Sequence, residues 1–270
     1  LFFVQQFGTA SIGRLFGPIM AIWFTMLAVL GIMHLSDDIS ILKSLSPHYA
    51  VELLMHYPKG FWLLGAVFLC TTGAEALYSD LGHCGRSNIR YSWVFVKICL
   101  ILNYLGQGAW LLANYKDQII PTQVMADGFN PFISVMPQWF KLPGIIISAT
   151  AAIIASQALV SGSFTLISEA MRLNLWPKMK IQYPTEEKGQ LYIPGISLLL
   201  FVGCIGVVLY FQKSANMGAA YGLAITMCMI STSILFANFL VSKRVFPLWI
   251  YLYLAVYFAI ETSFLIANLE

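Results

Sequence analysis

The sequence predicts an all-α integral membrane protein with seven transmembrane helices. Hydrophobic residues make up 59% of the 270 positions, charged residues only 10%, and the mean hydropathy is +0.77. That composition leaves too little polar surface to cover a soluble globule. The apolar residues also gather into runs of about 20, the length at which a helix crosses about 30 Å of hydrocarbon. The expected spans are residues 12–33, 61–81, 93–113, 143–171, 193–211, 218–240 and 246–267.

The first two spans are separated by residues 34–60, which we expect to form a loop because this stretch carries Asp37, Asp38 and Glu52. The second span holds the residue on which the functional interpretation depends.

In this second span an apolar run, residues 61–70, leads into Thr71, Thr72 and a glycine, and then places Glu75 where the middle of the helix should be. A carboxylate at the bilayer centre costs at least about 2.5–3.5 kcal/mol, so it normally faces an aqueous pathway or a partner. Thr-Thr-Gly lets the helix loosen and frees oxygen atoms to face a cation. The sequence therefore predicts a broken helix at about residues 71–76 with an ion site beside it.

Each residue of this site has a plainer interpretation as well. Glu75 could be a buried carboxyl group that holds a neighbouring helix in register, and Thr71 and Thr72 could bond to their own helical turn. Potassium prefers several neutral oxygens to a dense carboxylate cage, which favours Thr72 beside Glu75 as a ligand and gives Thr71 a weaker claim. Tyr221, in the sixth span, is a candidate aromatic gate, with an interfacial anchor as the alternative.

The third span places Asn103 and Gln107 four residues apart and therefore on one helix face. An interhelical hydrogen bond is favoured there over a place in the ion pathway. Gly106 and Gly108 are expected to permit close helix packing.

The fourth span is rich in small residues at helical spacing, which predicts close approach of a neighbouring helix. These residues are Ala151, Ala155, Ala158, Ser161, Gly162 and Ser163. Ser156, Gln157, Ser161 and Ser163 could line a wet cavity, although serines in spanning helices commonly bond to their own backbone. In the last span Glu261 is expected near the outer surface, either solvated or paired with a neighbour.

Basic residues sort between the two sets of loops that seven alternating spans create. One set holds Arg14, Arg86, Arg90, Arg172, Lys178, Lys180, Lys188, Lys243 and Arg244, and the other holds Lys43, Lys59, Lys116, Lys141 and Lys213. The positive-inside rule makes the first set cytoplasmic, so the first span runs outward and the second inward. The net charge of +3 follows from this placement and indicates no nucleic-acid partner.

No pattern in the chain indicates an enzyme or a cofactor. It contains no nucleophile elbow, P-loop or paired-carboxylate hydrolytic site. His56 and His83 have no second ligand at metal spacing. The chain begins in apolar sequence without Met, and we expect it to be an internal piece of a longer protein.

Residues 72–83, which read TGAEALYSDLGH, resemble the signature of the Kup (KUP/HAK/KT) potassium-uptake family. Further strings resembling that family follow in the expected order at residues 8–9, 17–20, 102–109, 154–158, 189–194 and 219–226. The resemblance covers essentially the whole chain. It implies that the spans correspond to the family's fifth to eleventh helices.

The family is similar in architecture to the leucine-transporter type of fold, which has two five-helix inverted repeats. The resemblance therefore implies that this chain is the second half of such a 5+5 fold, and that an aspartate-bearing helix completing the ion site lies elsewhere. It implies a multi-pass protein of the cell membrane that carries out secondary active, proton-coupled potassium uptake, with potassium and the proton as substrates and the bilayer as partner. A permease of the same fold for an organic cation or amino acid, and a passive cation channel subunit, are the alternatives. A homo-oligomer is left open.

Overall fold

The structure is a computed structural model that describes Phe2 and residues 10–57, 60–71, 86–115, 129–183 and 191–269. Within these residues it is helical, without a strand; one isolated antiparallel bridge joins Gln182 and Tyr192. In the part of the chain that the structure describes, six helical stretches are long and apolar enough to cross a membrane, and a shorter apolar helix covers Gly60–Cys70. The all-α membrane class predicted from the sequence is confirmed for the described residues. The 5+5 repeat and the number of spans stay predictions.

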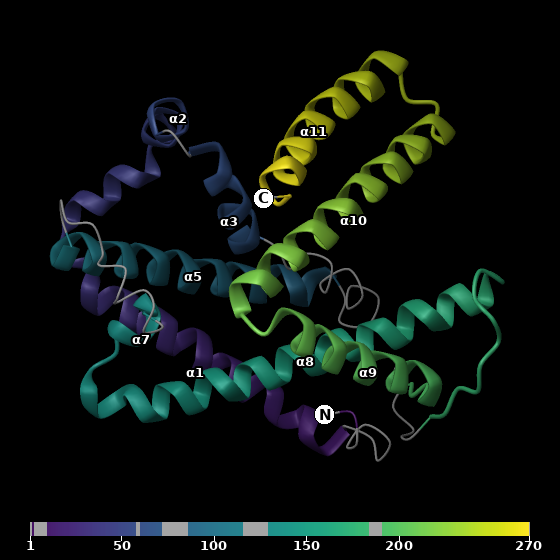
Figure 1. The fold of residues 1–270 in the computed structure, drawn as a ribbon, viewed down its shortest axis with the longest axis horizontal. Coiled ribbons are helices and arrows are strands. Elements are labelled where there is room, and N and C mark those ends of the chain that lie inside the picture. The colour runs from purple at the N-terminus through teal and green to yellow at the C-terminus, as the bar shows by residue number, and fades with distance from the viewer. Residues whose placement is uncertain are drawn as a thin grey trace. The chain divides into compact units, whose positions relative to one another are not determined.

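The chain divides into two compact units, which are shown as ribbons in Figure 1. The first contains α1, η2, α5, α7, η3, α8 and the beginning of α9. Their bounds are α1 Ala10–Leu35, η2 Ile39–Leu45, α5 Arg86–Tyr115, α7 Pro131–Ser134, η3 Gln138–Phe140, α8 Lys141–Arg172 and α9 Pro194–Phe211. The second contains the rest of α9 with α2 Pro47–His56, α3 Gly60–Thr71, α10 Ser214–Ser242 and α11 Pro247–Ala267.

In the first unit α1 packs most extensively against α5 and next against α8. A small apolar core at one end of α1 is formed by Met26 and Leu30 with Val135 and Met136, each of which is buried. Trp23 adds an edge-on ring contact to Phe132, with 5.6 Å between ring centroids. The segment around α7 is therefore fixed on α1 by apolar side chains.

In the second unit α10 and α11 form an antiparallel hairpin, and α3 contacts both (Figure 1). The helices start at favourable residues: Pro47 and Pro247 occupy first-turn positions, where the missing amide hydrogen costs nothing. The turn into α11 contains Arg244 at φ 55°, and the Val245 amide donates to the Leu240 carbonyl at 3.1 Å. This pattern ends α10 and reverses the chain.

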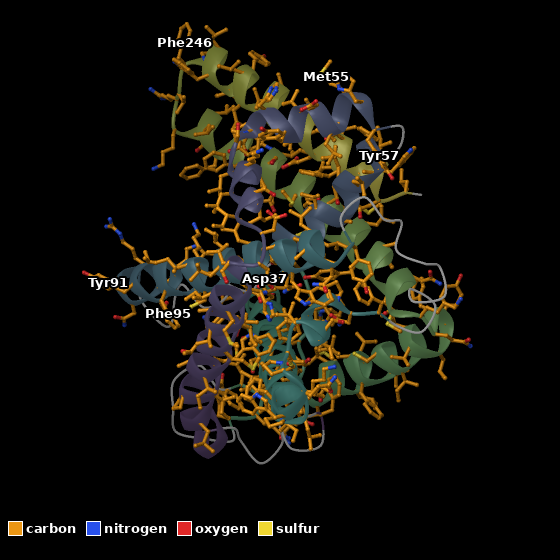
Figure 2. The ribbon with its side chains drawn as sticks, turned by 90° about the vertical axis from the view of Figure 1, so that its left-hand side faces the viewer. Asp37, Met55, Tyr57, Tyr91, Phe95 and Phe246 are labelled. Atoms are coloured by element: carbon orange, nitrogen blue, oxygen red, sulfur yellow. The ribbon has the colours of Figure 1, made fainter. Side chains whose placement is uncertain are left out.

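Large apolar side chains cover the outside of these helices, as expected where lipid replaces water. Tyr91 and Phe95, one turn apart on α5, project away from the helix (Figure 2) and are exposed. Only Ile196 and Ser197 are buried among the described side chains of α9.

The prediction that residues 34–60 form a loop is wrong, because this segment contains the helices η2 and α2. Pro47 opens α2 after Ser46 in extended conformation, and no residue of α2 is buried. Charged and polar residues in the stretch suggested a loop, but a proline at a first-turn position starts a helix equally well.

Candidate functional site

Helix α3 leads into the predicted ion site. Its described part extends from Gly60 to Thr71, and the rest of the predicted break at 71–76 lies outside the described residues. Thr72 and Glu75 lie outside the described residues, so their roles stay predictions. The structure describes how the helix before them is held.

Glycine brings α3 close to α11. A Cβ atom on Gly65 would lie 2.8 Å from the carbonyl oxygen of Ala267, so only glycine permits this approach without a shift. One turn later, Phe68 is buried and its ring centroid lies 4.9 Å from that of Phe264. On α10, a Cβ at Gly218 would meet the Leu69 side chain at 3.7 Å. Helix α3 is thus packed against both partners up to the turn before Thr71.

Asn268, which caps the end of α11, places a polar group at this junction. Its Nδ2 donates to the Phe264 carbonyl at 2.8 Å. Its Oδ1 faces α10 at Gly222, where a Cβ would overlap it, and would lie 3.4 Å from a Cβ on Gly65 of α3. The amide oxygen therefore lies between α3 and α10. Sequence reasoning missed Asn268; glycines in two apolar spans and a polar residue directly after the last span were the available signal.

Tyr221 lies on α10 beside this contact face. The face is formed by Gly218, Gly222 and Thr226, whose fully buried hydroxyl donates to the Gly222 carbonyl at 2.6 Å. Tyr221 is half exposed at the adjoining position. Neither its predicted gate role nor the alternative of an interfacial anchor is tested by this placement.

Glu261 is buried, and the expectation that it is solvated is wrong. Its side chain on α11 is 2% exposed, and Oε1 accepts a hydrogen bond of 2.6 Å from Ser233 Oγ on α10. Tyr253 Oη lies 3.4 Å from the same Ser233 hydroxyl. Oε2 has no hydrogen-bond partner among the described residues. The alternative expectation, pairing with a neighbour, is confirmed, because the face of α11 that carries Glu261 packs against α10.

The hydrogen bonds predicted for polar side chains of the third and fourth spans are confirmed only in part. Asn103 is 5% exposed, and its Oδ1 has no hydrogen-bond partner in the part of the chain described, so the expected interhelical bond is not made by this oxygen. Gln157 Nε2 donates at 3.4 Å to Ser161 Oγ of its own helix. The Ser156 and Ser163 hydroxyls donate to the Ala152 and Leu159 carbonyls one turn earlier in the same helix. This confirms the expectation that these serines bond to their own backbone.

The small-residue face of the fourth span differs from prediction. The buried positions of α8 are Gly144, Ala151, Ile154, Gln157, Phe164, Ser168 and Met171. Ala151 is the one member of the predicted set among them, and Ala155, Ala158 and Ser161 are exposed. By contrast, Gly106 of α5 does meet the backbone of α1 at Gly31, and Gly108 meets the Ile41 side chain. Close packing at both glycines of the third span is confirmed.

The described residues hold no group of three or more His, Cys, Asp or Glu side chains that could bind a metal ion.

Comparison with known proteins gives a match over the whole chain. Residues 1–270 match the family described as the K+ potassium transporter integral membrane domain. A probable potassium transport system protein Kup of Flavobacterium psychrophilum is 58% identical over 270 residues, which cover 100% of this chain and 41% of the relative. Namesakes from Cytophaga hutchinsonii and Clostridium perfringens are 57% and 54% identical over 276 and 271 residues, again 41% of each relative. No solved structure matches the chain.

The chain thus spans about two fifths of the length of the curated relatives it matches. The family match and the six membrane-competent helices of the described residues confirm the prediction of a multi-pass cell-membrane protein, and the relatives are named as transport proteins and not as enzymes.

Proposed function

Because the chain belongs to the Kup potassium transporter family, we propose that it is part of a secondary active carrier that takes up potassium together with protons. The match of all 270 residues to that family carries the proposal. The relatives are named for potassium transport, which favours potassium over an organic cation or amino acid as the substrate.

The proposed ion pathway runs past Thr72 and Glu75, with Thr71 and Tyr221 as further candidates. Two features support it. A carboxyl group inside an apolar span can exchange a proton for a cation, and α3, which precedes Glu75 in the sequence, is packed against α11 at Gly65 and against α10 at Gly218. In the proposed architecture, the second half of a 5+5 inverted repeat, this segment is the broken helix at the centre of the membrane.

The test is potassium uptake by the full-length protein in proteoliposomes at fixed membrane potential, since about 2.3 kcal/mol per charge per 100 mV otherwise acts on any cation. Glu75→Gln keeps shape and hydrogen bonding but removes the exchangeable proton. Proton-driven uptake should fall at least about tenfold, with normal insertion. Thr72→Val, which deletes one oxygen at similar volume, should weaken apparent potassium affinity more than maximal rate.

Three results separate the alternatives. Wild-type proton-driven uptake by Glu75→Gln would make Glu75 structural and place coupling elsewhere. Potassium flux that needs no proton gradient in the unchanged protein would indicate a channel. Uptake of an organic cation or amino acid in preference to potassium would indicate a permease.

A further inference from the structure

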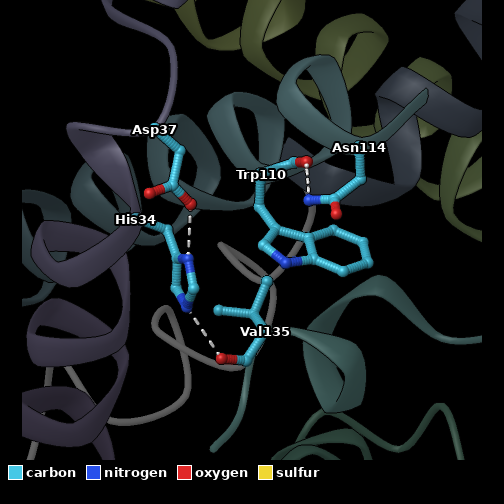
Figure 3. Close-up of polar contacts among 5 residues, drawn as sticks. All are labelled: His34, Asp37, Trp110, Asn114 and Val135. Atoms are coloured by element: carbon cyan, nitrogen blue, oxygen red, sulfur yellow. Dashed lines mark hydrogen bonds and ion pairs between the residues drawn. The ribbon is translucent and has the colours of Figure 1, made fainter. Parts of the chain in front are cut away.

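The end of α1 is tied to a distant segment by one histidine. His34 lies in the last turn of α1, and its Nε2 is 2.9 Å from the carbonyl oxygen of Val135, 101 residues away in the sequence (Figure 3). On the other side of the ring, Nδ1 is 2.6 Å from Asp37 Oδ2. The Asp37 amide also donates to the His34 carbonyl at 3.1 Å, which closes the turn after α1 and holds the carboxyl group beside the ring.

These two contacts together require a proton. A backbone carbonyl only accepts hydrogen bonds, so Nε2 must carry hydrogen to contact Val135. Nδ1 then either carries a second hydrogen and donates to the Asp37 carboxylate, or accepts from a protonated Asp37. In both cases the pair holds one proton more than a neutral imidazole beside a carboxylate. If that proton leaves and the carboxylate is charged, the neutral ring keeps one hydrogen, which is held on Nδ1 because the Asp37 carboxylate is a stronger acceptor than a backbone carbonyl. Nε2 then turns a lone pair toward the Val135 carbonyl oxygen, and that contact opens.

In the described part of the chain, no Lys or Arg side chain forms an ion pair with Asp37 that could take the place of this proton. Among the described residues of η2, the last turns of α5 and the first turn of α8, the further titratable side chains are Lys43, Tyr115 and Lys141, and Asp38 follows Asp37 directly. Asp38 Oδ1 accepts from the Ser40 amide at 2.8 Å in its own turn. Within the described residues, neither Lys43, Tyr115 nor Lys141 forms an ion pair or hydrogen bond with His34 or Asp37.

The pair is also open to proton exchange with water. The side chains of His34 and Asp37 are 21% and 33% exposed. By contrast, the side chain of Glu261 is buried. Histidine is the side chain whose ordinary titration falls between about pH 5 and 8.

Apolar packing holds the tied segment even without the proton. Val135 and Met136 are buried against Met26 and Leu30, and Phe132 packs against Trp23. Loss of the hydrogen bond between His34 and the Val135 carbonyl therefore loosens the backbone at Val135, while the apolar contacts keep the segment on α1.

We propose that His34 and Asp37 form a proton-binding site whose occupancy fixes the Val135 segment to the end of α1. The site shares no residue with the predicted pathway at Thr72 and Glu75. In the orientation expected from the basic residues it faces outward, on the side from which a proton-driven uptake carrier would receive protons. The link is complete at low pH and opens as the pH rises.

Hydrogen exchange of the full-length protein at about pH 5 and about pH 8 tests the proposal. The readout is the protection of the Ser134, Val135 and Met136 amides relative to their intrinsic exchange rates; these amides bond to the Asn130, Pro131 and Ile133 carbonyls. Protection should be about tenfold higher at the lower pH, the scale of one hydrogen bond between charged groups.

Two variants should remove the pH response in opposite ways. In Asp37→Asn the side-chain amide can donate to Nδ1 of a neutral ring, so both contacts form without the extra proton and protection should be high at both pH values. In His34→Leu neither contact forms and protection should be low at both. His56→Gln is the matched control, because His56 Nδ1 bonds to the Glu52 carbonyl of its own helix at 3.1 Å and forms no hydrogen bond with another helix among the described residues; it should keep the full response.

Equal protection of the unchanged protein at the two pH values would overturn the proposal. So would a pH response that survives in Asp37→Asn, which folds with a side chain of the same shape, or one that disappears in His56→Gln. Uptake activity enters none of these measurements, so failure here leaves the proposed transport function untouched.

Discussion

The two helix pairs with the most extensive contacts, α1–α5 and α10–α11, are joined by different means. Where α1 crosses α5, Gly31 and Gly106 bring backbone against backbone, and a Cβ on either glycine would overlap the other helix. Helices α10 and α11 are instead linked by side chains, through the Ser233–Glu261 hydrogen bond and the ring contact of Phe236 with Tyr253 at 5.3 Å.

The difference shows two ways to hold helices together where lipid removes the hydrophobic drive. Lipid tails are as apolar as leucine, so association depends on close van der Waals packing or on interhelical hydrogen bonds. The first device should be sensitive to added volume, and the second to loss of a bonding partner. Substitutions in the full-length protein can test this contrast.

The largest effect is expected from Gly106→Val. The new side chain would meet the backbone of α1 at Gly31, so the helices must separate, at a cost of about 3 kcal/mol or more. The yield of monodisperse protein in gel filtration and the midpoint of thermal unfolding should both fall sharply. Gly203→Val on α9 is the control, since nothing lies within 4 Å of that position. Equal losses in the two variants would contradict a special role for the crossing.

A smaller loss is expected from Glu261→Leu. The substitution removes the acceptor of the Ser233 hydroxyl in a buried place and should cost about 1–2 kcal/mol in thermal unfolding measured in detergent. Glu261→Gln retains an oxygen acceptor and should stay close to the unchanged protein. If the glutamine variant were as unstable as the leucine variant, the acid group itself, and not the hydrogen bond, would hold the hairpin.

The next prediction compares a serine that bonds to a neighbouring helix with a serine that bonds to its own helix. Ser233→Ala should cost about 0.6–1.7 kcal/mol, the range measured for interhelical hydrogen bonds in membranes. Ser231, two residues earlier, donates to the Met227 carbonyl of its own helix at 2.9 Å and is exposed. Ser231→Ala should therefore change stability by less than about 0.5 kcal/mol. Indistinguishable unfolding midpoints for the two alanine variants would argue against the link between α10 and α11.

The smallest effect is expected from Thr226→Val. The Thr226 hydroxyl is fully buried, yet its bond to Gly222 stays within α10. A valine of similar size leaves that carbonyl its helical partner, so unfolding should shift by less than about 0.5 kcal/mol. A shift as large as that of Ser233→Ala would mean that burial of the hydroxyl, and not bridging, sets the cost.

Much of this organisation could be predicted from the sequence, because hydropathy and helical spacing are local properties. The all-α membrane class followed from apolar runs of spanning length. The close approach at Gly106 and Gly108 followed from glycines on a helix face, and the self-bonded Ser156 and Ser163 from the ordinary behaviour of hydroxyl groups in helices. The predicted site at Thr72 and Glu75 rests on sequence alone.

Only the tertiary structure decided which face of each helix meets another. Glu261 was expected near water because it stands close to the end of its span, but the packing of α11 on α10 encloses it. Asn268 gained its place between Gly65 and Gly222 because α11 ends against α3 and α10. The contact of His34 with Val135 joins residues 101 positions apart. No local pattern encodes such pairings, because helix rotation and crossing are set by the surfaces that pack, and those surfaces come from distant parts of the chain.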